Sequence, residues 1–163
     1  MAENIIFAAQ RKAVDNRINI KNKKAYFNYE LLEQLTAGIQ LTGTEIKSVR
    51  TGKVSLADSY CYFKKNELWV TGMRISEYAG GSYNNHDPYR VRKLLLNRKE
   101  LNRLEKKVRE KGLTIIVLRV FVDERGYAKL EIALGRGKRQ YDKREEIKRK
   151  EMKRDLARLR KVR

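Results

Sequence analysis

The chain has 163 residues, 41% of them hydrophobic, which suffices for one domain with a modest core. Its 39 Lys and Arg against 20 Asp and Glu give a formal net charge of +19. Such an excess attracts polyanions, with nucleic acid as the first candidate and an anionic membrane surface as the second. No run approaches the roughly 18 apolar residues of a membrane span, and the apolar patch at residues 5–9 is too short for a secretory leader. One cysteine and one histidine exclude an internal disulfide and a zinc constellation, so we expect a reducing cytoplasm.

The first part of the chain predicts an arm followed by a long strand. Residues 1–21 carry few periodic signals and are expected to form a mobile N-terminal arm. Residues 24–41 mix leucines at helical offsets with aromatic and β-branched residues at alternating positions. Thr36, Ala37 and Gly38 interrupt the helical pattern. We therefore predict a long, bent strand with a bulge at these three residues.

The stretch from Leu41 to Ser59 predicts a short charged helix held between two strands. Ile46 and Val49 stand three residues apart and give the helix one apolar face. A threonine at its start supplies a cap, and Gly52 ends it in the left-handed conformation. A solvated surface helix is the plainer interpretation. The functional interpretation is that the helix presents three cations together: Lys47, Arg50 and Lys53.

Further along, the sequence predicts a hairpin and a long loop. Aromatic-rich runs at residues 60–63 and 67–70 flank a short polar break, which is typical of a β-hairpin. Residues 74–89 are rich in Gly, Asn and Pro and are expected to form a loop. Loops of that length inside a small domain are usually functional or mobile.

The third quarter of the chain predicts a capped helix and a second hairpin. Asn97 and Glu100 fit a capping box, a leucine stripe follows, and Gly112 ends the helix. Residues 113–118 have the apolar, β-branched composition of a buried strand. After a turn at residues 123–126, strict alternation predicts a partner strand with one dry face and one wet face.

These elements predict a mainly β fold. Several antiparallel strands with two or three short helices are too few for two sheets, so we expect a small barrel resembling the oligonucleotide-binding (OB) type over residues 22–137. The tail, residues 138–163, has 13 Lys or Arg against 5 Asp or Glu and therefore a net charge of +8. Its apolar stripe is too thin to pack on a core. We predict that the tail is disordered when free and helical when a polyanion neutralises it.

The sequence offers little for catalysis. His86 and Asp87 form a conceivable acid–base pair, but an Asp-Pro dipeptide commonly starts a turn and no motif places a nucleophile nearby. The glycine- and arginine-rich segment at 135–139 lacks the spacing of a phosphate-binding loop. We expect a protein that is not an enzyme and needs no cofactor or metal. Two alternatives stay open: an RNA-acting enzyme that uses His86 and Asp87, and a basic structural protein of the ribosome.

Basic residues with aromatic residues between them favour RNA binding instead. Lys23 and Lys24 stand beside Tyr26, Phe27 and Tyr29, so charge is combined with rings on which bases stack. Two further basic groups follow the long loop and the last predicted strand. These groups, together with the short charged helix, define a predicted RNA-binding set: Asn22, Lys23, Lys24, Phe27, Lys47, Arg50, Lys53, Arg90, Arg92, Lys129, Arg136, Gly137, Lys138 and Arg139.

From Asn22 onward the chain resembles the SsrA-binding protein (small protein B) family. The resemblance rests on five ordered blocks: NKKA at 22–25, AGIQLTGTEIKSVRTGKVSLADSY at 37–60, NHDPYRVRKLLL at 85–96, KGLTIIVLRVF at 111–121 and KLEIALGRGKRQYDKRE at 129–145. It implies an OB-like barrel that binds the tRNA-like part of transfer-messenger RNA (tmRNA) in place of an anticodon arm. It also implies delivery of this RNA to stalled ribosomes for trans-translation, with the tail folding inside the empty mRNA channel.

The resemblance further assigns roles within the tail and exposes two departures. Asp142, Lys143 and Arg144 fall where the family's tail meets the decoding centre, and Gly137 matches a glycine at the flexible junction. The implied partners are tmRNA and the ribosome, with no membrane, and the protein is expected to be a monomer. Phe27 replaces a histidine that many members carry, and Thr36 replaces an acid, so polar contacts expected at both positions lack their usual side chains.

Overall fold

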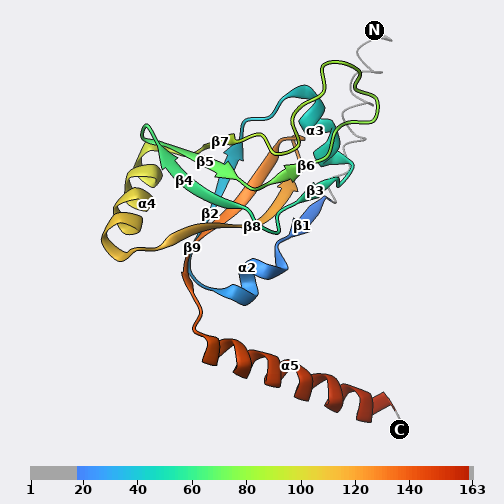
Figure 1. Ribbon diagram of the computed structural model, residues 1–163, viewed down its shortest axis with the longest axis vertical. Coiled ribbons are helices and arrows are strands. Elements are labelled where there is room, and N and C mark those ends of the chain that lie inside the picture. Colours follow the sequence, from blue (N-terminus) through green and yellow to red (C-terminus); the bar gives the residue numbers. More distant parts are fainter. Residues whose placement is uncertain (1–17, 162–163) are drawn as a thin grey trace.

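The computed structural model describes residues 18–161, in which six antiparallel strands form a closed ring (Figure 1). Around the ring each strand is hydrogen-bonded to the next, and β8 pairs with β9 to close it. In spatial order the ring consists of β8 (Thr114–Val122), β4 (Tyr60–Lys64), β5 (Glu67–Thr71), β7 (Arg92–Leu95), β2 (Tyr29–Ile39) and β9 (Ala128–Gly137). The mainly β barrel predicted from the sequence is confirmed.

Within residues 18–161, short strands and four helices accompany this ring. β1 (Asn19–Lys21) extends the sheet at β8, and β3 (Val54–Ser55) pairs with β6 (Arg74–Ile75) in a separate two-stranded sheet. The helices are α2 (Lys23–Asn28), α3 (Gly43–Arg50), α4 (Arg98–Lys111) and α5 (Gln140–Lys161). Figure 1 shows α2 and α3 at different ends of the barrel and α5 leaving the body on the α2 side. Of the arm expected at residues 1–21, residues 1–17 lie outside the described part, and residues 19–21 form β1 rather than an arm.

Strand β8 is buried on both of its faces. Val117, Val120 and other residues of one face point into the barrel, whereas Ile116 and Leu118 pack with Ala25 and Ala133 beneath α2. A register irregularity in the β8–β9 ladder between Val117 and Arg119 shifts the alternation by one residue. Residues 115–118 of the strand therefore form a continuous buried apolar run, although the strand belongs to an antiparallel sheet.

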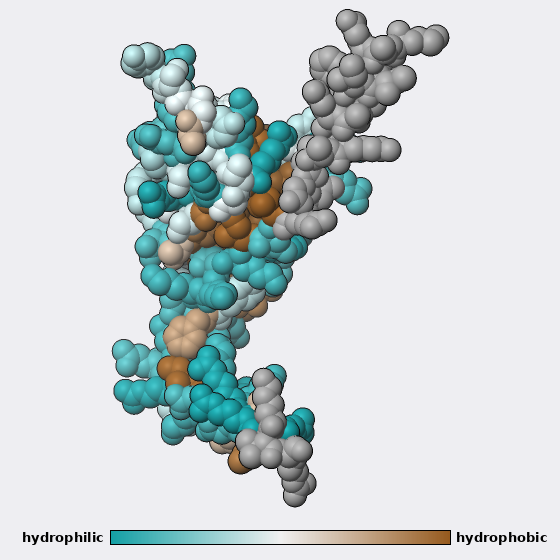
Figure 2. Space-filling view, turned by 90° about the vertical axis from the view of Figure 1, so that its right-hand side faces the viewer, coloured by the Kyte–Doolittle hydropathy of each residue, from teal (hydrophilic) through white to brown (hydrophobic). Residues whose placement is uncertain are grey.

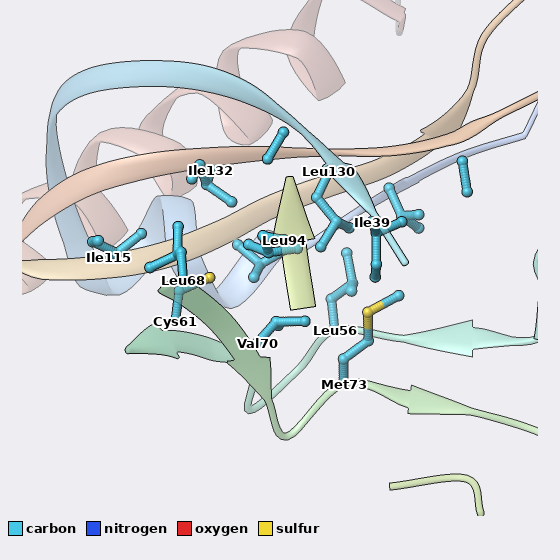
Figure 3. Close-up of a cluster of buried hydrophobic side chains, with 14 of the residues drawn as sticks. Ile39, Leu56, Cys61, Leu68, Val70, Met73, Leu94, Ile115, Leu130 and Ile132 are labelled. Atoms are coloured by element: carbon cyan, nitrogen blue, oxygen red, sulfur yellow. The ribbon is translucent and has the colours of Figure 1, made fainter. Parts of the chain in front are cut away.

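The barrel interior is filled by one cluster of aliphatic side chains. Figure 3 shows Leu68, Leu94, Leu130 and Ile132 converging from three different strands, β5, β7 and β9. Cys61 belongs to the same cluster, and its burial raises the pKa of the thiol, so it behaves as a small hydrophobic residue. The sequence interpretation of Cys61 as a core residue is confirmed.

Several helix ends and one hairpin turn lie where local signals in the sequence predicted them. The β4–β5 turn uses Lys65 and Asn66 with φ of 51° and 59°, the left-handed pair that twists into a tight hairpin. Glu100 accepts from the Asn97 backbone N–H at the start of α4, and Gly112 caps its end with φ of 58°. The predicted short helix is α3, followed by Gly52 at φ of 76°.

The long strand expected over residues 24–41 is wrong in its first part. Residues 23–28 form α2, whose start is capped by the Asn22 side chain, and only then does β2 begin. The irregularity of β2 also lies elsewhere, between Leu31 and Glu33 rather than at residues 36–38. The capping bond from the Ala25 N–H to Asn22 Oδ1 (3.3 Å) favours one helical turn over extended chain.

The tail is a helix rather than the disordered segment expected when free. α5 covers 22 residues, and its described side chains are exposed over most of its length. Ion pairs one turn apart, such as Lys150 Nζ to Glu146 Oε1 at 2.9 Å, offset part of the repulsion between its cations.

Two glycines with left-handed backbone yield a prediction about stability. A Cβ added at Gly72 would lie 2.3 Å from the Asp58 carbonyl oxygen, whereas one added at Gly112 would meet no atom within 4 Å. Both residues have positive φ, so alanine costs about 1–2 kcal/mol of backbone strain at either site. We expect Gly72→Ala to lower the free energy of unfolding well beyond Gly112→Ala, as measured by urea denaturation. If both variants lose the same free energy of unfolding, the Asp58 carbonyl does not restrict the side chain at residue 72.

Candidate nucleic-acid interface

The charged helix α3 is anchored by a buried carboxylate. Glu45 has no exposed surface, and its Oε1 accepts from Arg92 Nε at 2.8 Å and from Arg90 Nε at 3.0 Å. Its Oε2 accepts from Arg90 Nη2 at 2.7 Å and from the Thr42 backbone N–H at 2.8 Å. Arg92 is also fully buried and donates to the Met73 carbonyl oxygen at 2.8 Å. We call Glu45, Arg90 and Arg92 the carboxylate clamp.

The clamp holds Glu45 in its charged form. Burial alone would raise the pKa of this carboxyl group, but the bonds from Arg90 and Thr42 and the charge of Arg92 outweigh it and lower the pKa to about 2. The pKa of Arg92 is lowered by burial, against the pull of Glu45, yet a guanidinium beside a carboxylate stays protonated at neutral pH. The clamp is thus a charge group in which Glu45 and Arg92 are buried and both Glu45 oxygens are hydrogen-bonded.

Two residues of the predicted RNA-binding set are structural instead. Arg92 has no exposed surface, and its guanidinium group is bonded within the clamp. It is therefore not accessible to a phosphate. Asn22 is 5% exposed, and its Nδ2 donates to the carbonyl oxygens of Leu56 (2.8 Å) and Val117 (3.0 Å). Both expectations are corrected because buried polar groups must be satisfied internally.

Beside α3 lies an open pocket, which we call the α3 pocket. It has a volume of about 660 Å³ and reaches from α3 across the end of β2 and β7 to the β8–β9 turn. Arg50 and Lys129, both in the predicted set, stand on its wall, and Arg50 Nη2 donates to the Gly126 carbonyl oxygen at 3.0 Å. Lys129 Nζ lies 3.1 Å from Asp123 Oδ2. The remaining wall includes Leu41, Leu95, Arg125 and Tyr127.

The α3 pocket also contains residues that the sequence analysis did not select. Leu95 is 53% exposed and Tyr127 is 67% exposed, so an apolar side chain and an aromatic ring are open to solvent among cations. Exposed aromatic faces beside basic residues are the usual means of holding unstacked RNA bases. The run of leucines at 94–96 carried a signal, because consecutive residues of a strand face opposite sides and one of them had to point outward.

The other cations of α3 and its neighbours stay on the surface. Lys47 and Lys53 are exposed, and Lys47 Nζ lies 5.2 Å from the centre of the Tyr78 ring. Arg90 is 37% exposed, but two of its nitrogens are bonded to Glu45. The structure therefore brings Arg50 and Lys129 into one pocket, while Arg90 acts as a link between the clamp and the surface.

The remaining members of the predicted set gather at the other end, where the tail joins the body. Lys23 and Lys24 are exposed on α2. Arg136 and Gly137 are exposed at the end of β9, and Arg139 is exposed just beyond it. Lys138 is tied in place: its N–H donates to the Asn28 carbonyl oxygen at 2.8 Å and its Nζ contacts Glu146 at 2.8 Å. The predicted set is thus divided between two regions.

The same junction holds the start of the tail helix against α2. Glu146 lies between Lys138 and Lys150, whose hydrogen bonds lower its pKa to about 2. Lys150 Nζ lies 5.3 Å from the centre of the half-buried Phe27 ring, so this predicted stacking residue already faces a cation from the tail. Asp142 and Arg144 are exposed at the beginning of α5, and Lys143 is half-buried.

His86 is buried, and both of its ring nitrogens have hydrogen-bond partners. It is 7% exposed, with Nδ1 at 2.9 Å from Thr44 Oγ1 and Nε2 at 3.0 Å from the Ile75 carbonyl oxygen. A carbonyl only accepts, so Nε2 carries a proton. Asp87 Oδ1 accepts from the Tyr89 backbone N–H at 2.9 Å, as expected of a turn. Both side chains therefore organise the loop that leads to Arg90.

Residues 18–161 match neither the geometry of a metal site nor that of a membrane-spanning helix. No group of three or more His, Cys, Asp or Glu side chains is placed to hold a metal ion there. Among the described helices, none is both long and apolar enough to cross a membrane. On the face shown in Figure 2, hydrophilic residues cover most of the tail, and hydrophobic residues gather in a band on the body.

Comparison with known proteins decides the family. The family model for SmpB protein matches residues 19–162. This chain belongs to the SmpB family. An SsrA-binding protein of Bacteroides thetaiotaomicron is 58% identical over 142 residues, which are 87% of this chain and 95% of that protein. One of Cytophaga hutchinsonii is 55% identical over 149 residues, covering 91% and 97%.

A solved structure agrees with this assignment. A chain described as "tmRNA-SmpB: a journey to the center of the bacterial ribosome" is 46% identical and superimposes with a TM-score of 0.64. The match covers 80% of this chain and 94% of the solved one. The resemblance seen in the sequence blocks is confirmed, and with it the SmpB-type barrel.

The clamp yields a prediction about stability and pH. The folded-state pKa of Glu45 is about 2 against an ordinary 4.5, so the unfolded chain binds more protons between these values. The clamp's contribution, about 3 kcal/mol, is therefore complete above pH 4.5 and is lost as the pH falls toward 2. We expect Glu45→Gln to lower the free energy of unfolding by about 3 kcal/mol at pH 7, and the deficit to shrink as the pH falls.

Urea denaturation at pH 7, 4 and 3 measures this difference, with Glu67→Gln as the matched control. Glu67 is 39% exposed and pairs with Lys93 at the surface, so its loss costs at most about 1 kcal/mol. A deficit for Glu45→Gln that stays constant with pH, or equals that of Glu67→Gln, would contradict the clamp.

Proposed function

We propose that this chain binds the tRNA-like part of tmRNA through the α3 pocket and carries the RNA to stalled ribosomes for trans-translation. The observation that carries the proposal is the α3 pocket, where exposed Leu95 and Tyr127 lie among Arg50, Arg125 and Lys129. Relatives that match nearly their whole length are named SsrA-binding proteins, and the solved neighbour is described as tmRNA-SmpB in the bacterial ribosome.

The chemistry of the pocket suits a folded RNA. Cations on the rim neutralise phosphates and fix the position of the protein, but phosphate contacts carry no sequence information. The Tyr127 ring offers a flat face, and Leu95 an apolar surface, to bases that are unstacked in an RNA loop. Selectivity would then come from the shape of the RNA, which places a loop and its phosphates against one pocket.

We propose that the tail acts separately, inside the vacant mRNA channel and decoding centre. α5 leaves the body as a helix with its side chains largely free (Figure 1). Most of its charged residues are cations, and an RNA-lined channel would neutralise them. Asp142, Lys143 and Arg144 lie within the first five residues of this helix and would be the tail residues that meet the decoding centre.

The proposed role is binding, with no catalytic step. Both ring nitrogens of His86 are engaged by Thr44 and Ile75 inside the loop, which leaves neither one free for a substrate proton. The role places the protein in the cytoplasm, where ribosomes and their RNAs act.

Two substitutions in the α3 pocket are expected to weaken tmRNA binding in different ways. Lys129→Ala removes a cation, so the dissociation constant rises and the slope of log K against log salt becomes shallower by about one. Leu95→Ala removes an apolar contact, so affinity falls with the salt slope unchanged. Filter binding of the labelled tRNA-like fragment at several salt concentrations measures both effects.

Lys106→Ala on α4 is the matched control for charge. Lys106 is 74% exposed and lies 3.9 Å from Glu110, and it lines no part of the α3 pocket. Its loss is expected to change affinity little. Affinity that falls as far for Lys106→Ala as for Lys129→Ala would mean that the net charge, rather than the pocket, binds the RNA.

Removal of residues 138–163 is expected to separate the two roles. The barrel and both of its ends remain, so binding of the tRNA-like fragment is kept, whereas tagging on stalled ribosomes in a reconstituted translation system is abolished. Tagging that persists without the tail would refute the division of roles between body and tail.

A further inference from the structure

A second pocket lies at the end of the barrel that carries α2, and the α3 pocket shares none of its residues. This α2 pocket has a volume of about 400 Å³ and is open to solvent. Its walls come from α2, from the turn before β4 and from the starts of β4 and β8. Its lining includes Lys24, Asn28, Tyr29, Asp58, Tyr60 and Thr114.

The walls of the α2 pocket are fixed by buried contacts. Asn22 Nδ2 bonds to the carbonyl oxygens of Leu56 and Val117, so one side chain ties α2 to the turn and to β8. Ser59 Oγ donates to the same Leu56 oxygen at 2.7 Å. Gly72 also lies close to the Asp58 carbonyl group and restricts the turn before β4. The pocket is therefore formed before any ligand arrives.

Aromatic rings and free polar groups line this fixed shape. Tyr60 is 50% exposed, and its ring is supported by Tyr62 with 6.4 Å between ring centroids. Tyr29 is half-buried against the cluster that contains Ile116. The side chains of Asn28 and Thr114 take part in no hydrogen bond within residues 18–161. A ring for stacking beside an unused amide and hydroxyl is the combination that recognises a nucleobase.

The charge around the pocket fits a phosphate backbone. Lys24 is 64% exposed and is held only loosely by Asp58, at 3.4 Å between Nζ and Oδ1. Lys23 is its exposed neighbour on α2, and Arg139 is exposed where the tail begins. The Asn28 carbonyl accepts from the Lys138 N–H at 2.8 Å, which places the tail junction next to the pocket. A strand whose base enters the pocket would have its phosphates among these cations.

We propose that the α2 pocket binds one unpaired nucleobase of an RNA strand. The base stacks on Tyr60, its edge bonds to Asn28 and Thr114, and the adjoining phosphate lies on Lys24. This inference rests on the proposed RNA-binding function and extends it, since it gives the body a second RNA contact beside the tail. The two pockets would then hold different segments of RNA.

Binding of fluorescein-labelled hexaadenylate to the full-length chain, followed by fluorescence anisotropy, tests this site. We expect Tyr60→Ala to weaken binding about 5- to 150-fold, the range that one base–aromatic stack supplies, and Tyr60→Phe to bind as the wild type does. Tyr83→Ala is the matched control because Tyr83 is fully exposed on the loop between β6 and β7. It is expected to leave the affinity unchanged. Thermal melts followed by circular dichroism establish that the variants are folded.

A hexamer of abasic ribose phosphates separates base recognition from charge. It is expected to bind far more weakly than hexaadenylate, with no difference between wild type and Tyr60→Ala. Equal binding of the two hexamers, or equal losses for Tyr60→Ala and Tyr83→Ala, would overturn the proposal. Leu95→Ala is assayed in parallel with the tRNA-like fragment of tmRNA. Its affinity tests the α3 pocket by itself, so failure of one site is distinguishable from failure of the other.

Discussion

The buried charge of Glu45 is the constraint on which the arrangement of α3 depends. A carboxylate with no exposed surface is tolerated only if every oxygen is satisfied, and here two arginines and a backbone N–H satisfy it. Arg92 begins β7, so the clamp fixes the first turn of α3 against a strand of the barrel. The apolar side of α3 alone, Ile46 and Val49, would not define its direction so closely.

The position of α3 then determines the shape of the α3 pocket. Arg50 at the end of the helix bonds to Gly126 in the β8–β9 turn and closes one side of the pocket. Leu95 and Lys129 come from β7 and β9, which the closed ring holds on either side of β2. Closure of the barrel fixes these strands, and the clamp fixes the helix above them. Arg50, Lys129 and the exposed leucine therefore meet at positions fixed by the helix and the strands, and the β8–β9 turn adds Arg125 and Tyr127.

Local chemistry in the sequence predicted much of this fold. Asn97, Glu100 and Gly112 mark the ends of α4, and the two hairpins follow from alternation and turn residues, because each of these signals acts over a few residues. The apolar run of β8 predicted a buried strand, and its second buried face is explained by the packing of α2.

The errors arose where a distant partner decides the outcome. Arg92 was assigned to the RNA surface because it is charged, but its partner Glu45 stands 47 residues earlier. Asn22 was assigned to the RNA surface because basic residues follow it in the sequence. Its side chain instead bonds to the carbonyl oxygens of Leu56 and Val117. Conversely, Leu95 and Tyr127 were missed because apolar residues are expected inside. Only the tertiary structure shows which face of each strand is open.

The most direct test of the account is the amide chemical-shift map of the isotope-labelled chain titrated with the tRNA-like fragment of tmRNA. If the clamp and the barrel build an RNA-binding end, the largest shifts will lie around the α3 pocket, at Leu41, Arg50, Leu95 and Lys129. Shifts confined to α4, with these four residues unmoved, would contradict the account.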